Sequence, residues 1–216
     1  MIDTNSPAVA SGTNDSYTLL AQIKERPILF SGAMVRAILD GKKTQTRRVI
    51  KPQPLGDYLY LSDINPQYAC FTGSSARRCP YGKVGDRLWV RETFCIVNDR
   101  EFGGGLWVDY RATPRYSEEA PAGWENAPND IAALKWKPSI HMPKGASRIN
   151  LEITNIRVER IQDISDNDIE FEGVEVFGDS IVRKTLFTDL WNKINKKRGY
   201  GWDKNPWVWV VTFKRV

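Results

Sequence analysis

A short basic segment of the chain combines side chains that can cleave an amide. Lys43 stands where a predicted helix ends, and a predicted strand follows it with two threonines, Thr44 and Thr46, at alternate positions. Arg48 continues this alternation. Because alternate residues of a strand point the same way, Thr44, Thr46 and Arg48 are expected to face one pocket, which Lys43 enters from the preceding turn.

Amide cleavage needs a nucleophile or an activated water, a base, and a proton donor for the leaving nitrogen. Thr46 can supply a hydroxyl, and Lys43 can take its proton if burial or nearby arginines lower its pKa. Arg48 can hold a carbonyl or phosphate oxygen with two hydrogen bonds. The same residues also suit an ordinary strand with a basic flank, so their spacing alone does not decide between the two interpretations.

The content of histidine and cysteine narrows the chemistry further. The chain has one histidine, His141, and three cysteines at irregular spacing. Cys70 and Cys79 have no second pair of Cys or His residues to complete a zinc site. We therefore expect no metal and no cofactor, and His141 is interpreted as either a loop residue or a substrate contact.

The composition predicts a folded domain with a polyanionic partner. The 216 residues suit one domain, 41% are hydrophobic, and the formal net charge is +5. No apolar run approaches the roughly 20 residues that a membrane span needs, and no signal peptide is visible, so we expect a cytoplasmic protein without membrane contact. A second basic cluster, at positions 193, 196, 197 and 198, is interpreted as a solvated face.

Several strands and a few helices are expected, which predicts an α+β fold. Ser31 is expected to cap the first helix, and Ser165 begins the second with Asp168 three residues later, as in a capping box. The last apolar segment is hydrophobic on both faces, which is typical of a central strand. The predicted strands cover residues 27–30, 44–50, 87–94, 106–110, 149–158 and 207–213, and the helices 33–40, 165–173 and 185–196.

Prolines and glycines divide the rest of the chain. Residues 1–24 are polar without periodicity and are expected to form a flexible tail. Residues 25–216 are expected to form a single domain. Segments at about 52–82 and 112–145 lack periodicity and are predicted to be loop-rich insertions outside the core.

Three motifs occur in an order that resembles the ASCH (activating signal cointegrator homology) family. Residues 41–48 match its Gly-x-Lys-Thr-x-Thr-x-Arg signature, and residues 85–90 match Gly-Asp-x-Leu-x-Val. Residues 164–173 resemble its Ile-Ser-x-x-Asp-x-x-x-Glu-Gly helix. Segments 139–143 and 205–210 look like those of longer, phage- or prophage-encoded members. The resemblance implies a PUA-like β-barrel flanked by short helices.

The resemblance also implies candidate functions. Some small ASCH proteins are amidohydrolases of N4-acetylcytidine that use Lys, Thr and Glu, and these fall on Lys43, Thr46 and Glu172 here. Glu170 is the nearest competitor for the carboxylate. Other members have been proposed as RNA-binding or ribonuclease-like domains, so a modified nucleoside and RNA are both candidate partners. The residues expected to bind the substrate are Thr44, Arg47, Arg48, Arg91, Glu92 and His141.

Arg91 and Glu92 also admit a second interpretation. They follow Trp89 on one predicted strand and either form an internal ion pair or line the same pocket as Lys43.

Overall fold

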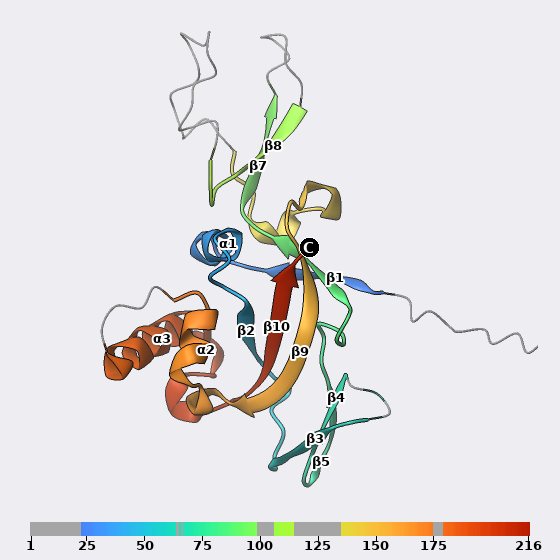
Figure 1. Cartoon of the computed structure of the whole chain (residues 1–216), viewed down its shortest axis with the longest axis vertical. Helices are drawn as coiled ribbons and strands as arrows, with labels where there is room; N and C mark the ends of the chain where they lie inside the picture. Colours follow the sequence, from blue (N-terminus) through green and yellow to red (C-terminus); the bar gives the residue numbers. More distant parts are fainter. Residues whose placement is uncertain (1–22, 64, 66, 99–105, 115–134, 175–178) are drawn as a thin grey trace, which may run out of the picture.

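A strongly curved sheet organises the computed structural model, which describes residues 23–63, 65, 67–98, 106–114, 135–174 and 179–216. Its two longest strands are antiparallel and lie side by side (Figure 1). In β9, buried and more exposed residues alternate, and in β10 the apolar residues are buried on both faces, as the sequence predicts. The sheet order is β1 (Glu25–Leu29), β6 (Arg87–Arg91), β9 (Asn150–Arg160), β10 (Trp207–Arg215) and β2 (Gln45–Val49).

The expected closed barrel is not formed by the described residues. The fold is α+β, as predicted, but β1 and β2 are the two edges of the sheet and share no ladder there. Instead, the guanidinium of Arg48 on β2 donates a hydrogen bond of 2.7 Å to the carbonyl of Leu29 on β1. A side chain thus connects the edges where a barrel would have backbone pairing, and β2 keeps a free edge.

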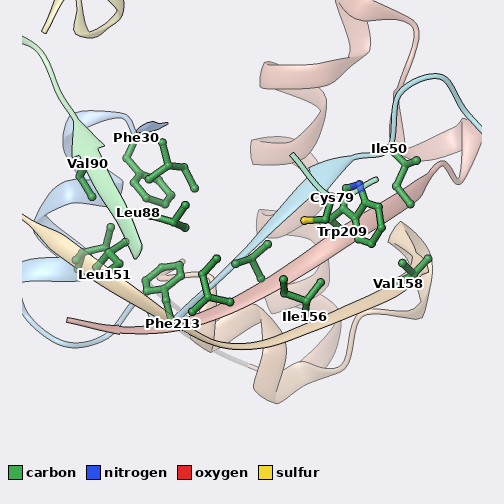
Figure 2. Packing of buried hydrophobic residues seen from close by; sticks show 14 of the residues in the cluster. Phe30, Ile50, Cys79, Leu88, Val90, Leu151, Ile156, Val158, Trp209 and Phe213 are labelled. Atoms are coloured by element: carbon green, nitrogen blue, oxygen red, sulfur yellow. The ribbon is translucent and has the colours of Figure 1, made fainter. Parts of the chain in front are cut away.

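The central strand β10 separates two hydrophobic clusters. Trp209 and Phe213 belong to the main core, which also holds Phe30 and Leu88 (Figure 2). Val208 and Val210 point to the opposite face and pack against α3 (Ser180–Asn195). Burial on both faces confirms the prediction of a central strand.

The segment from 52 to 82 is part of the core, and the prediction of an excursion outside it was wrong. It forms an antiparallel sheet of β3 (Tyr58–Leu61), β4 (Tyr68–Phe71) and β5 (Ser74–Arg78). Ala69, Phe71 and Cys79 are buried in the main core. The prolines flank these strands, so they do not prevent pairing.

The second expected insertion is described only in part. Strands β7 (Phe94–Asn98) and β8 (Leu106–Tyr110) pair and project from the main sheet (Figure 1). Residues 115–134 and residues 1–22 of the expected tail lie outside the described residues. After residue 134, the chain forms the 3-10 helices η3 (Ser139–His141) and η4 (Lys144–Ala146). The flexible tail, the single domain and the second insertion stay predictions.

In the described part of the chain, three α-helices cover the sheet. In α1 (Gly32–Leu39), Ser31 takes the N-cap position, but its side chain makes no capping hydrogen bond. In α2 (Asp166–Phe171), Ser165 accepts from the backbone N–H of Asp168, as predicted. Helix α3 buries Phe187 and Trp191.

The remaining helical segments are short. On α3, the apolar residues Leu186 and Ile194 are each 39% exposed. The 3-10 helices η5 (Ile161–Asp163), η6 (Lys196–Arg198) and η7 (Trp202–Lys204) complete the fold. None of the described helices combines the length and the apolar character that crossing a membrane requires.

Candidate functional site

The register along β10 decides which polar side chains meet. Val210 pairs with Arg47 of β2 on one side and with Arg157 of β9 on the other. Cross-strand partners point to the same face of a sheet, so both guanidinium groups lie on the face that Val210 turns toward α2 and α3. Gln45 shares this face, and Thr46 points to the opposite one.

The residues that the sequence places around one pocket therefore lie on two opposite faces of β2. Thr46 and Arg48 alternate with Gln45 and Arg47, and Lys43 falls on the second set. The backbone of Thr44 is the reason, because its N–H donates to Phe171 (3.0 Å) and its carbonyl accepts from Phe213 (2.8 Å). This pairing extends the strand-like alternation back to Lys43, which does not enter from a turn.

Lys43 and Glu172 form a buried ion pair. The ammonium of Lys43 has three acceptors: the carbonyls of Gln45 (2.8 Å) and Glu172 (2.7 Å) and the Glu172 carboxylate (2.8 Å). Burial lowers the pKa of Lys43 most strongly, and the charges of Arg48 and Arg47 lower it further, whereas Glu172 opposes the shift. The net direction is downward, as the amide-cleavage hypothesis requires.

A glycine brings the two partners together. Gly173 has φ +74°, and a Cβ there would lie 2.7 Å from Cβ of Lys43 and 2.8 Å from Cβ of Ala37. Only a residue without a side chain allows the end of α2 to approach the start of β2 this closely. The Glu-Gly pair of the third motif thus has a structural reason.

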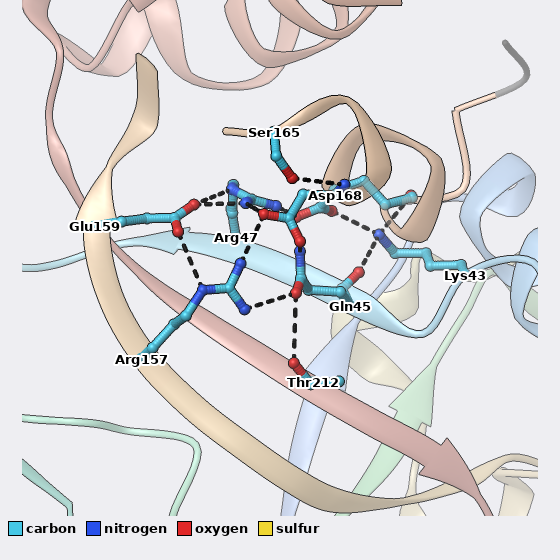
Figure 3. A network of polar contacts seen from close by, with 9 residues as sticks. Lys43, Gln45, Arg47, Arg157, Glu159, Ser165, Asp168 and Thr212 are labelled. Atoms are coloured by element: carbon cyan, nitrogen blue, oxygen red, sulfur yellow. Dashed lines mark hydrogen bonds and ion pairs between the residues drawn. The ribbon is translucent and has the colours of Figure 1, made fainter. Parts of the chain in front are cut away.

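Arg47 is committed to three carboxylates. Its guanidinium donates to Glu159 (2.7 Å), to Asp168 (2.9 Å) and to the second oxygen of Glu172 (3.1 Å), as Figure 3 shows in part. Its side chain is 1% exposed. The sequence predicts that Arg47 binds substrate; it is one of the residues that line the cavity described below, and its guanidinium holds the carboxylate of Glu172 in place.

An outer layer completes the network, and the sequence analysis did not assign it to the site. Arg157 donates to Gln45 (2.9 Å), to Asp168 (2.8 Å) and to Glu159 (3.1 Å). Burial by itself raises the pKa of Asp168, but the hydrogen bond from Gln45 and the charges of Arg47 and Arg157 bring it below the ordinary value. The sequence does contain a signal for this layer. Polar residues stand two apart on one strand, Gln45 and Arg47 on β2 and Arg157 and Glu159 on β9, so each pair shares a face.

A cavity of about 410 Å³ lies along the free edge of β2. Thr46 and Glu172 both line it and are 3% and 6% exposed. Lys43 lies behind Glu172, fully covered. The wall also includes Tyr81, Trp191 and Trp209 and the cations Arg48, Lys51, Arg78 and Arg198. The volume falls in the range of roughly 300–1,000 Å³ typical of small-molecule sites.

Arg48 lines the cavity and connects β2 to the neighbouring core. Its guanidinium lies 5.2 Å from the centre of the Phe30 ring and donates through Nη2 to Leu29. Its Nε is buried and has no hydrogen-bond partner within the part of the chain that the structure describes. A buried donor without an acceptor is costly, and Arg87 and Arg91, which do not line the cavity, each hold another Nε of this kind.

Three residues expected to bind substrate lie elsewhere. Glu92 is paired with Arg148 through both carboxylate oxygens, each at 2.9 Å. Arg91 donates to the carbonyl of Ile140, and its guanidinium lies 5.4 Å from the ring of Trp89. His141 is exposed on η3. None of the three lines the cavity, so the structure does not join them to Lys43 and Thr46.

The two candidate carboxylates lie in different surroundings. Glu172 is buried, paired and at the cavity, whereas Glu170 is exposed on α2. Among the described residues, no group of three or more His, Cys, Asp and Glu side chains is arranged to hold a metal ion.

The fold and cavity define an α+β domain with a buried Lys-Glu pair beside a cation-lined pocket. No family model and no curated protein matches the chain. A solved structure, the ASCH domain from Lactobacillus crispatus JV V101, is similar to this one with a TM-score of 0.42 and 11% sequence identity over 89% of this chain and 79% of that chain. It bears the name of the family that the three sequence motifs resemble.

Proposed function

We propose that this protein is an amidohydrolase that removes the acyl group from N4-acylated cytidine or a related modified nucleoside. The observation that carries the proposal is the carboxylate of Glu172 at the cavity wall. One of its oxygens accepts from Lys43 at 2.8 Å and the other from Arg47 at 3.1 Å. Two cations hold this group in position at a cavity that Thr46 also lines.

The arrangement assigns a role to each group. The Thr46 hydroxyl attacks the acyl carbonyl carbon, and its proton passes to Glu172. Arg48, which lines the cavity, donates from its guanidinium to the oxygen on which negative charge develops. The C–N bond then breaks, Glu172 returns the proton to the departing N4 nitrogen, and the acyl group remains on Thr46 as an ester. Water activated by Glu172 hydrolyses this ester, which releases a carboxylic acid and restores the hydroxyl.

Lys43 acts through Glu172 in this proposal. Its ammonium does not line the cavity, so direct contact with the substrate is not part of its role. Its lowered pKa makes the proton easier to release toward Glu172 as that carboxylate protonates the leaving amine. Lys43 is therefore a positioning residue, which changes the role of direct base that the sequence alone favoured.

The test follows hydrolysis of N4-acetylcytidine by the ultraviolet absorbance difference between substrate and cytidine. We expect Glu172→Gln and Thr46→Val to lose at least about 100-fold in kcat, the usual size of a general acid–base or nucleophile contribution. Glu170→Gln, two residues away on the exposed side of α2, is the matched control and keeps full activity. Full turnover in folded Glu172→Gln protein would refute the mechanism.

A second candidate is a nucleic-acid-binding module, including a ribonuclease-like one. The observation that favours it is the set of exposed cations at the cavity, Lys51, Arg78 and Arg198. It predicts binding of RNA without release of an acyl group and with an affinity that falls steeply with salt. Undetectable or salt-independent RNA binding would rule it out.

A further inference from the structure

Among the described residues, the cavity carries positive charge that no neighbouring carboxylate neutralises. Its lining contains one carboxylate, Glu172, which is already matched by Lys43 and Arg47. Among the described residues, none of the other lining cations, Arg48, Lys51, Arg78 and Arg198, forms an ion pair. A concave site with an excess of one sign of charge concentrates ligands of the opposite sign.

The contacts of these cations orient them without neutralising them. The ammonium of Lys51 lies 5.2 Å from the centre of the Tyr200 ring. Arg78 donates through Nε to the amide oxygen of Gln67 at 3.3 Å, which leaves both terminal nitrogens available. Both partners are uncharged, so the cations keep their full charge for a ligand.

The exposed fractions of the lining residues distinguish the deep part of the cavity from its mouth. Thr46 and Glu172 are 3% and 6% exposed and form the deep part. Lys51, Arg78 and Arg198 are exposed and come from three separate segments of the chain, so they form the mouth. A ligand that reaches the deep groups must therefore leave its outer end among these three cations.

We propose that the natural ligand of this cavity is a phosphorylated nucleotide, free or within a strand, whose phosphate binds Lys51, Arg78 and Arg198. Its base, with the N4-acyl group, extends inward to Thr46 and Glu172, and its sugar spans the distance to the mouth. Arginine and lysine bind phosphate oxygens through charge-assisted hydrogen bonds. The position of the base rests on the proposed function, whereas the phosphate site rests on the uncompensated cations alone.

Binding measurements separate the phosphate site from the catalytic proposal. Calorimetric titration of the full-length protein with cytidine and with cytidine 5′-monophosphate, at low salt, measures the contribution of the phosphate. We expect the monophosphate to bind at least about tenfold more tightly, and this ratio to fall as salt screens the exposed cations. A triple variant, Lys51→Ala with Arg78→Ala and Arg198→Ala, brings the ratio close to one.

The chain offers a charge-matched control. Lys193→Ala with Lys196→Ala and Lys197→Ala removes the same number of exposed charges near the same end of α3, and none of these residues lines the cavity. This variant keeps the preference for the monophosphate. If both triple variants lose it equally, or if the wild-type protein binds nucleoside and nucleotide alike or neither, the phosphate site is refuted.

The source of the phosphate is distinguished with a short oligoribonucleotide of unmodified sequence. A gain over the monophosphate that the cavity variant abolishes identifies a strand, and equal affinity identifies the free nucleotide. Turnover of N4-acetylcytidine and of its 5′-monophosphate is measured in parallel. Nucleotide preference without turnover supports the phosphate site and refutes the amidohydrolase, and turnover without nucleotide preference does the reverse.

Discussion

The Lys43 ammonium illustrates how a single buried charge is kept in this domain. Its three hydrogen-bond acceptors match the three N–H donors of an ammonium. Its pKa is nevertheless lowered, so the loss of hydration outweighs the attraction of Glu172. The pair thus costs stability relative to apolar residues of similar size, although removing one partner alone costs more.

This balance leads to a prediction about unfolding. Lys43→Met leaves Glu172 with Arg47 as its remaining cationic partner, and we expect a loss of about 3–5 kcal/mol in the free energy of unfolding, typical of a broken buried pair. Lys43→Met combined with Glu172→Leu removes both charges and is expected to cost less than the single variant. Urea denaturation at neutral pH measures both. A double variant that costs as much as the two single variants together would contradict the prediction.

The junction between α2 and β2 sets the geometry of the site at the scale of secondary-structure elements. Thr44 bonds to the last residue of α2, and Gly173 lets this helix end reach Lys43. The backbone N–H of Asp168 donates to the Ser165 side chain and fixes the start of the helix. The six residues of α2 then lead directly to Glu172. Helix position, not strand sequence alone, therefore places the carboxylate.

Gly173→Ala tests this close approach. The added methyl group would lie under 3 Å from two other side-chain carbons, and we expect a loss of roughly 1–3 kcal/mol from overpacking, beyond the cost of a positive φ. Gly41→Ala is the matched control, because Gly41 has φ +73° and no atom within 4 Å of such a methyl group. Urea denaturation compares the two variants. Equal losses would show that backbone conformation alone requires glycine at 173.

Patterns with a clear physical period could be predicted from the sequence. The alternation in β9, the burial of both faces of β10 and the cap at Ser165 are local signals, and the structure confirms them. The grouping of Lys43 with Thr46 failed because the alternation of β2 extends further back than the predicted turn. Arg91 and Glu92 were grouped with the site by sequence, but β6 lies three positions from β2 in the sheet.

The sheet of β3, β4 and β5 shows why weakly patterned segments escape prediction. Its strands have four or five residues, and all three ladder partners in β5 are arginines or serines on a largely exposed strand. The burial of Ala69 and Phe71 depends on contact with distant parts of the core. Such long-range packing leaves little trace in a short window of sequence.

At the scale of the whole molecule, the open sheet and the cavity have a common cause. Because β1 and β2 do not pair in the described residues, β2 retains a free edge, and residues from both of its faces reach the same cavity. Thr46 approaches from the main-core face and Glu172 from the helix face. A closed barrel would separate these two faces, so the open edge is what allows one ligand to meet both groups.

The carboxylate network should make the stability of the whole domain sensitive to acid. The pKa of Asp168 is depressed in the folded protein, so its stabilising effect is present above about pH 4, the unfolded value, and is lost as pH falls through the folded value. Asp168 joins α2 to β2 and β9, so its protonation loosens three elements at once. Asp168→Asn should therefore lose less stability than the wild-type protein between about pH 5 and about pH 2, measured as the urea midpoint.

Asp166→Asn, in the same turn of α2 but without an ion pair among the described residues, is the control and should follow the wild-type slope. If Asp168→Asn also follows that slope, the acid sensitivity belongs to other carboxylates and the network does not govern it.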